Sequence, residues 1–427
     1  MRMSQEPSPS ISGLAPFKEK LFRTLWIAAF VSNVGTWMQN VGVSWLAATL
    51  SASPLMISLI QTASSLPSLL VSYPAGVISD HADRRKLLIW LQVFLFGVVT
   101  VLTICSWLHL LDMRLLILFT FLVGIGSALT NPVWQAITPE VVSPGNMREA
   151  VALNGVNFNL ARAVGPALGG VMLVLWGVKS IFLFNAISFL ALVIGLYQWH
   201  NNPTIFKSVE FRKTAIEGLQ AVRRSAPFKH LLVRTVAFTA FVSILFAFLP
   251  QLSKYEWRQD SGQYTWLWVS LGMGALIGSQ LYGIGNKYLS SGKMVFLSCE
   301  LVAVCLFLLT LTRNFYCLNS IMVLTGIGWI NATSTLNVLA QQHSPNALKG
   351  RFLAINVTVF QGSIALSSAF WGFLSKFLAP LTVLSIAALG MAVFSGVLMF
   401  FPMEELGTTP PQSVACADPL LQFKTGS

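Results

Sequence analysis

Apolar runs of about 20 residues recur along nearly the whole of this 427-residue chain, separated by short polar or charged stretches. A helix needs about 20 apolar residues to cross a bilayer. The hydrophobic share is 55% and the charged share only 10%, which is too apolar a composition for a soluble domain. Because lipid offers no hydrogen bonds, a spanning segment has to satisfy its own backbone, as a helix does. The sequence therefore predicts an all-α integral membrane protein.

Twelve transmembrane helices are expected, six on either side of a polar, basic stretch near the middle of the chain. They cover residues 22–46, 55–79, 87–108, 115–137, 150–175, 180–198, 231–252, 266–288, 293–311, 315–339, 352–373 and 378–401. We expect a disordered cytoplasmic arm at 1–20, a six-helix bundle at 21–199, a cytoplasmic linker at 200–230, a second bundle at 231–402 and a cytoplasmic tail at 403–427.

The Lys and Arg residues behind the net charge of +12 are divided unevenly between the two sides of the membrane. With the N-terminus in the cytoplasm, 20 Lys and Arg residues fall on the cytoplasmic side and six on the other. This asymmetry is the positive-inside rule, and it predicts that both termini are cytoplasmic. The charge therefore gives no reason to expect a nucleic-acid partner. The expected partners are the lipid bilayer and a small-molecule substrate.

Several function classes lack the residues they require. The five Cys include no C-x-x-C pair, and the five His lie at predicted helix ends and loops without metal-ligand spacing. The stretch Ser291–Lys293 does not match a phosphate-binding loop. We therefore expect no metal, no cofactor, no enzyme activity and no ATP-driven pump.

The two halves of the chain resemble each other at a spacing of about 200 residues. The run Leu122–Gly126 recurs as Leu324–Gly328, and Ser143-Pro144 recurs as Ser344-Pro345. Repeated matches at one spacing indicate a duplication. Two homologous six-helix bundles are typical of a transporter whose binding site lies between them, near the middle of the membrane.

A charged turn after the second predicted helix carries a resemblance to a known family. Its pattern Gly76-x-x-x-Asp80-x-x-x-Arg84-Arg85 resembles the signature of the major facilitator superfamily between helices two and three. The resemblance implies that family's fold, with two pseudo-symmetric six-helix bundles. It also implies that Asp80 and Arg84 form a cytoplasmic charge relay, which helps to lock the outward-open state.

Further segments are similar to the bacterial branch that contains the enterobactin exporters, also called transmembrane secretion effectors. They include 32–39, 131–136 and 152–154. In the fifth predicted helix, Gly165, Pro166, Gly169 and Gly170 resemble a motif associated with exporters. Proline kinks a helix and glycines allow close helix approach, so this joint could close one end of a cavity. Ordinary small-residue packing is the alternative interpretation.

Polar side chains at helical spacing mark candidate cavity faces on several predicted helices. Hydrogen bonds between helices are the alternative for any single hydroxyl, whereas amide stripes on several helices favour a wet cavity. The candidates are Asn33, Trp37, Asn40, Gln61, Asn131, Gln135, Thr239, Asn337, Gln341 and Asn356.

Ionisable residues inside the predicted helices are candidates for ion pairing or coupling. Arg162, placed one to two turns into its helix, either reaches the cytoplasmic surface and pairs with Glu140 or contacts an anionic substrate. Glu300, placed near the cytoplasmic end of the ninth helix, either couples transport or pairs with Lys293 or interfacial water. The position where many proton-coupled exporters of this superfamily carry arginine is Thr120 here, which weakens the case for proton coupling.

These patterns together predict a secondary active transporter that exports a bulky amphipathic small molecule by alternating access. The resemblance suggests a siderophore-like metabolite or a drug as cargo and protons as the coupling ion. An importer of the same fold and a non-transporting membrane receptor are the alternatives. We expect a monomer in the bacterial plasma (inner) membrane.

Overall fold

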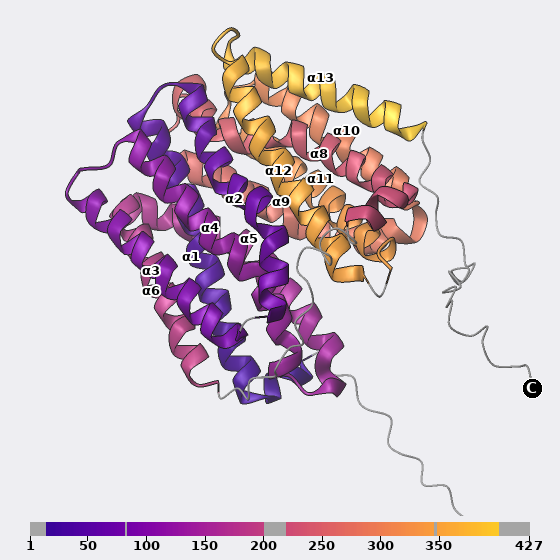
Figure 1. Ribbon diagram of the computed structural model, residues 1–427. Helices are drawn as coiled ribbons and strands as arrows, with labels where there is room; N and C mark the ends of the chain where they lie inside the picture. The colour runs from indigo at the N-terminus through magenta and orange to yellow at the C-terminus, as the bar shows by residue number, and fades with distance from the viewer. Residues whose placement is uncertain (1–13, 82, 200–218, 346–347, 401–427) are drawn as a thin grey trace, which may run out of the picture.

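The computed structural model describes residues 14–81, 83–199, 219–345 and 348–400, and the side chains of 73–81 lie outside this description. The first half contains α1 (Lys20–Leu50), α2 (Pro54–His81), α3 (Arg84–Trp107), α4 (Met113–Val141), α5 (Met147–Trp176) and α6 (Val178–Tyr197). The second half contains α8 (Ala226–Gln251), α9 (Ser261–Tyr288), α10 (Ser291–Leu311), α11 (Phe315–Gln342), α12 (Lys349–Leu374) and α13 (Pro380–Met399). Figure 1 shows the two halves side by side, indigo to magenta and rose to yellow.

All twelve predicted helices are present, and their largest boundary errors lie at the starts. Helix α8 begins at Ala226 and α9 at Ser261, five residues before each predicted start. Polar capping residues set these starts, since Ser225 accepts a hydrogen bond from the amide of Phe228 and Asp260 forms a capping box with Gln263. An apolar run identifies a helix core but does not include its polar first turn.

Eleven of the long helices in the described part of the chain are apolar enough to cross a membrane, and α1 is the exception. It is nevertheless 31 residues long and packs along α5 and α6. Its hydropathy is low because polar side chains interrupt its middle turns; they are Ser32, Asn33, Thr36, Gln39 and Asn40. The helix that carries the most candidate cavity residues is therefore the one long described helix that does not contain a sufficiently apolar span.

Two helix pairs form the seam between the halves: α2 lies against α12, and α5 lies against α9 (Figure 1). Small residues permit the close approach. A Cβ atom on Gly272 of α9 would lie 3.0 Å from the carbonyl oxygen of Ala163 in α5, and one on Gly362 of α12 would lie 2.6 Å from Cδ1 of Leu69 in α2. Backbone-level contact of this kind is how helices associate in lipid.

The helices have two ends, which we name by their residues. The Arg84 end carries the turn before α3 and the α4–α5 connection, which includes the 3-10 helix η2 (Pro144–Asn146). The Tyr255 end carries the α1–α2 connection and the π-helical segment η3 (Leu252–Glu256) after α8. Successive helices run in alternating directions between these ends.

Replacement of Gly272 by leucine should separate α5 from α9, because the new side chain meets the backbone of α5 rather than a movable side chain. We expect a loss of about 1–3 kcal/mol in stability, measured as a lower thermal unfolding midpoint in detergent. Gly97→Leu on α3 is the matched control, since a Cβ there meets nothing within 4 Å. Equal midpoints for the two variants would contradict the close seam.

Candidate functional site

A positively charged side chain lies at the middle of the seam. Arg162 lies fifteen residues beyond the first residue of the 30-residue helix α5, about 22 Å along its axis. Trp37 lies near the middle of the 31-residue helix α1, and Trp329 near the middle of the 28-residue helix α11. These three residues, which we call the Arg162 cluster, therefore lie at mid-membrane depth.

The guanidinium of Arg162 contacts aromatic rings from both halves. Its Cζ atom lies 4.9 Å from the centroid of Trp329 and 5.8 Å from that of Trp37, which is within cation–π range. Its Nη2 atom is buried and has no hydrogen-bond partner among the described residues. The cluster thus combines a half-buried arginine with a buried N–H group that is open to an acceptor.

Further aromatic rings extend the cluster on both sides. Phe158 of α5 packs edge-to-face on Trp37, with ring centroids 6.2 Å apart. In the second half, Trp329 contacts Phe246 at 4.9 Å and Phe238 at 5.5 Å. The two tryptophans that contact Arg162 are therefore themselves packed against aromatic rings of their own halves.

The expected pairing of Arg162 with Glu140 is not found. Nη1 of Arg84 binds Oε1 of Glu140 at 2.5 Å, near the C-terminal end of α4. Arg162 is about four turns into α5, not one to two, so its guanidinium is too deep for the expected position near the interface. Contact with an anionic substrate, the other alternative, stays a prediction.

At the Arg84 end, Arg84 and Arg85 connect the start of α3 to α4 and α6 through hydrogen bonds. Arg84 also donates to the carbonyl of Ala136 in α4, at 3.1 Å. Arg85 donates to the carbonyls of Leu196 and Tyr197 at 3.0 and 3.1 Å, where a cation complements the C-terminal end of α6. Gly76 and Asp80 lie in the final turns of α2, where side chains are outside the described part, so the relay role of Asp80 stays a prediction.

A hydrogen-bonded cluster around Glu19, also at this end, was not predicted from the sequence. The carboxylate of Glu19, just before α1, accepts hydrogen bonds from Oγ of Ser143 at 2.7 Å and Nδ2 of Asn146 at 2.8 Å. Residues Ala15–Lys18, expected to belong to a disordered arm, instead form a 3-10 helix, and Phe17 packs against Trp26. No local pattern reveals this cluster, because its partners are more than 120 positions apart.

The Tyr255 end is joined across the seam. Nζ of Lys254 and the hydroxyl of Tyr255 both donate to the carbonyl of Ala48 in α1, at 3.0 and 2.9 Å. The rings of Trp45 and Tyr264 lie 5.1 Å apart. These contacts connect α1 with the second half directly.

The fifth-helix motif fits α5 against both α1 and the second half. A Cβ atom on Gly165 would lie 2.5 Å from Cβ of Trp37, and one on Gly169 would lie 2.8 Å from Cα of Met38. Gly170 faces Thr265 of α9 across the seam, and Pro166 is buried within α5. The close fit at Gly165 sets the position of Trp37, and hence one face of the Arg162 cluster.

The predicted cavity residues fall into separate environments. Four amides on α4 and α11 are exposed, and all lie in the half of their helix nearer the Arg84 end; they are Asn131, Gln135, Asn337 and Gln341. Asn40 is half-buried and Asn356 is buried. An exposed amide facing hydrocarbon is costly, so these four amides indicate a polar environment beside α4 and α11.

Other predicted cavity residues form hydrogen bonds with side chains or backbone of their own half. Asn33 donates to Oδ1 of Asn157 at 2.9 Å, and Gln61 donates to Oγ of Ser65 at 3.2 Å. Thr239 is fully buried and donates to the carbonyl of Thr235 in its own helix. These contacts match the alternative of interhelical and local hydrogen bonding, because a short side chain in a helix reaches its own backbone first.

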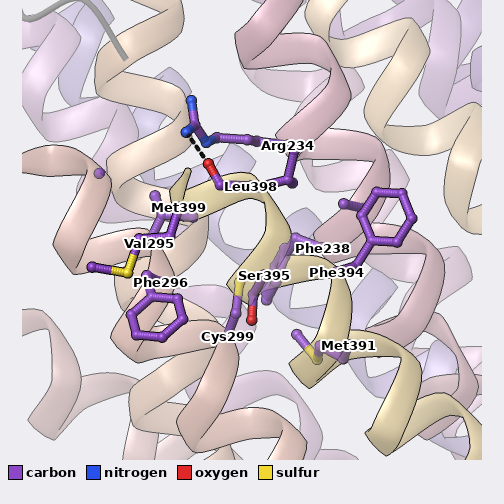
Figure 2. A pocket seen from close by; sticks show the side chains of 12 residues that line it. Arg234, Phe238, Val295, Phe296, Cys299, Met391, Phe394, Ser395, Leu398 and Met399 are labelled. Atoms are coloured by element: carbon purple, nitrogen blue, oxygen red, sulfur yellow. Dashed lines mark hydrogen bonds between the residues drawn. The ribbon is translucent and has the colours of Figure 1, made fainter. Parts of the chain in front are cut away.

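A pocket of about 400 Å³, counting its open mouth, lies elsewhere, between α8, α10 and α13 of the second half (Figure 2). Arg234 closes one side by donating to the carbonyl of Leu398 at 2.8 Å, and Cys299 and Ser395 line it. All of its lining residues belong to the second half, so we do not assign it to the seam.

Glu300 lies beside this pocket and away from the predicted end position. It is nine residues into the 21-residue helix α10, near the middle, and accepts a hydrogen bond from the hydroxyl of Ser395. It does not join Arg162 or Glu140. Among the described residues, no three His, Cys, Asp or Glu side chains gather closely enough to hold a metal ion.

The duplicated twelve-helix architecture with a central seam is the fold of the major facilitator transporters. A mutant form of the nucleoside transporter NupG superposes with a TM-score of 0.69 over 89% of this chain and 98% of its own, at 12% identity. A D-xylose–proton symporter gives a TM-score of 0.68 over 88% and 97%, at 13% identity. These likenesses support the fold alone.

The family follows from the sequence comparisons. The model of the transmembrane secretion effectors matches residues 11–425, and the chain belongs to this family. The staphyloferrin A transporter of Staphylococcus aureus is 25% identical over 80% of this chain and 86% of its own length. The enterobactin exporter EntS of Escherichia coli O1:K1 is 24% identical over 92% and 95%. The chain is therefore a multi-pass membrane transporter and not an enzyme.

The Glu19 cluster predicts a pH dependence. Partial burial acts to raise the pKa of Glu19, but the hydrogen bonds from Asn146 and Ser143 outweigh it, and the pKa lies below the ordinary 4.5. A lowered pKa means that the ionised group stabilises the fold above about pH 4.5 and that this contribution is lost as the pH falls through the lowered value.

The variant Glu19→Gln should therefore unfold at a lower temperature than the wild type at pH 7 and at nearly the same temperature at about pH 3. Thermal unfolding followed by tryptophan fluorescence at both pH values measures the difference. Because Glu19 stays in contact with solvent, which screens its charge, we expect less than about 1 kcal/mol at pH 7. A difference that is equal at both pH values would contradict the role of the charge.

Proposed function

We propose that this protein is a secondary active transporter that exports a bulky, amphipathic small molecule by alternating access. The observation that carries the proposal is the Arg162 cluster, where aromatic side chains from both halves meet a polar group at mid-membrane depth. A site that both halves build can be exposed to either side of the membrane as the halves rock. The names of the two siderophore-handling relatives favour a siderophore-like metabolite, with a hydrophobic drug as the other candidate.

The described contacts support a seam that is closed at the Tyr255 end. Hydrogen bonds between the halves include three that join Lys254 and Tyr255 to the end of α1, and one that joins Thr62 to Ala365 in the α2–α12 pair. The amides of α4 and α11 lie toward the other end. If the Arg84 end is cytoplasmic, as the positive-inside rule predicts, the site opens to the cytoplasm.

This assignment gives roles to the remaining predicted elements. Asn131, Gln135, Asn337 and Gln341 would line the entrance, and the fifth-helix glycines would close the opposite end. We propose a monomer in the bacterial plasma membrane, with cytoplasmic termini and the bundles 21–199 and 231–402 as the rocking units. In such a cycle, Arg84 and Arg85 hold the first unit together.

The direct test compares the extracellular metabolites of a deletion strain and its parent, grown with and without iron. Loss of one secreted compound in the deletion strain, restored by the wild-type gene, is the expected result. Accumulation of a compound outside the deletion strain would instead indicate import. An unchanged metabolite profile in both media, with no flux of candidate compounds in vesicles, would leave a receptor as the better description.

Proton antiport is the coupling that we propose, with Glu300 as the group that carries the proton. It is a carboxylate near the middle of a membrane helix, and the hydroxyl of Ser395 donates to it. In everted vesicles, collapsing the pH gradient should slow wild-type export several-fold. The variant Glu300→Gln should be slow with or without the gradient, because its amide cannot release a proton.

Ser395→Ala is the matched control for Glu300→Gln, since it removes the hydrogen bond but keeps the carboxylate. Its export should remain dependent on the gradient. If Glu300→Gln retained full gradient dependence, Glu300 would not be the coupling group. If the wild type were indifferent to the gradient, another ion would drive export.

A further inference from the structure

Arg162 carries a charge that the described residues leave without a counter-ion. A guanidinium has five N–H donors and stays protonated in proteins, so it cannot escape its charge by titration. Its two tryptophan neighbours attract the charge through their ring faces, but ring faces accept no conventional hydrogen bond in the guanidinium plane. The buried Nη2 atom remains without an acceptor among the described residues.

The membrane-helix carboxylates whose side chains the structure describes are not available to Arg162. Glu140 binds Arg84, and Glu300 accepts from Ser395 in the second half. Glu149 belongs to the same helix as Arg162, but thirteen residues earlier, which is about 20 Å along the axis. The counter-ion therefore has to come from outside the described residues.

The aromatic neighbours define what such an anion looks like. Trp37 and Phe158 belong to the first half, and Trp329 belongs to the second, so an anion held by Arg162 would meet aromatic rings of both halves. A guanidinium fork binds a carboxylate through two parallel hydrogen bonds. The geometry suits a molecule that carries an ionised oxygen group next to an aromatic or broad apolar body.

We propose that Arg162 is the anion-binding group of the transport site, and that the cargo is a carboxylate-bearing or similarly ionised amphipathic compound. This inference rests on the proposed transport function and names the substrate class for that same site. A bound anion would supply the counter-ion that Arg162 lacks among the described residues and would neutralise its charge at the seam. A structural tie between the halves through the two tryptophans is the competing explanation.

The test uses the purified full-length chain in lipid nanodiscs and two probes of nearly equal shape. 2-Naphthoate carries the charge, and 2-naphthamide is its neutral counterpart; calorimetry measures binding of each, with empty nanodiscs as the blank. The wild type should bind naphthoate about tenfold more tightly than the amide, as expected for a charge-assisted bidentate contact. Equal binding of the two probes, or binding of neither, would overturn the proposal without any variant.

Variants then assign the preference to one side chain. Arg162→Gln should weaken naphthoate binding by about tenfold and change naphthamide binding by less than about twofold. Arg162→Lys keeps the charge but loses the fork, so an intermediate loss is expected. Arg234→Gln, which alters a buried arginine elsewhere in the membrane region, is the control and should keep the preference.

A purely structural role would give a different pattern. Arg162→Gln would then weaken both probes equally, or leave both unchanged while lowering the thermal unfolding midpoint. If Arg162→Gln does not fold, the Arg162→Lys series and the wild-type comparison still decide the matter. If the protein exports a compound but binds the two probes equally, the anion-binding role of Arg162 is refuted and the transport function stands. If it binds naphthoate selectively but shows no flux, the transport function is refuted and the anion site stands.

Discussion

The placement of one guanidinium at the middle of the membrane constrains the rest of this structure. A charge at that depth costs several kcal/mol unless its surroundings compensate. Here the compensation comes from the faces of Trp37 and Trp329, which belong to different halves of the molecule. Trp37 can take its position because Gly165 has no side chain beneath it. The glycine–proline motif of α5 and the half-buried Arg162 are thus parts of one arrangement, in which helix packing presents a charge to the seam.

The fold could be predicted in detail because the bilayer leaves few alternatives. Apolar length specified twelve helices, and the repeat specified two halves. Errors arose where contacts between distant residues decide the outcome. Glu19 binds Ser143 and Asn146 across more than 120 positions, which no local pattern reports. The depths of Arg162 and Glu300 were misjudged because depth depends on where each helix starts relative to the membrane surface.

The candidate site was less predictable than the fold for a related reason. Helical spacing identifies a shared face, but it does not say whether that face meets a neighbouring helix, lipid or water. Thr239 fits a polar stripe and is nevertheless buried and bonded to its own helix, whereas Asn131 and Gln135 of a similar stripe are exposed. The aromatic partners of Arg162 come from α1 and α11, a combination that only the packing of two halves reveals.

The described polar contacts divide into two kinds with different consequences for movement. The Arg84–Glu140 ion pair lies within the first half, as does the cluster around Glu19. The cross-half hydrogen bonds at the Tyr255 end, by contrast, use uncharged acceptors such as the Ala48 carbonyl. Breaking such bonds costs about 1 kcal/mol each, or up to about 3 where the donor is charged, since water replaces the partner. Separation of the halves at that end would therefore leave the Arg84–Glu140 ion pair and the Glu19 cluster intact. In the proposed transport cycle, a ligand bound at Arg162 would lie between aromatic rings of both halves.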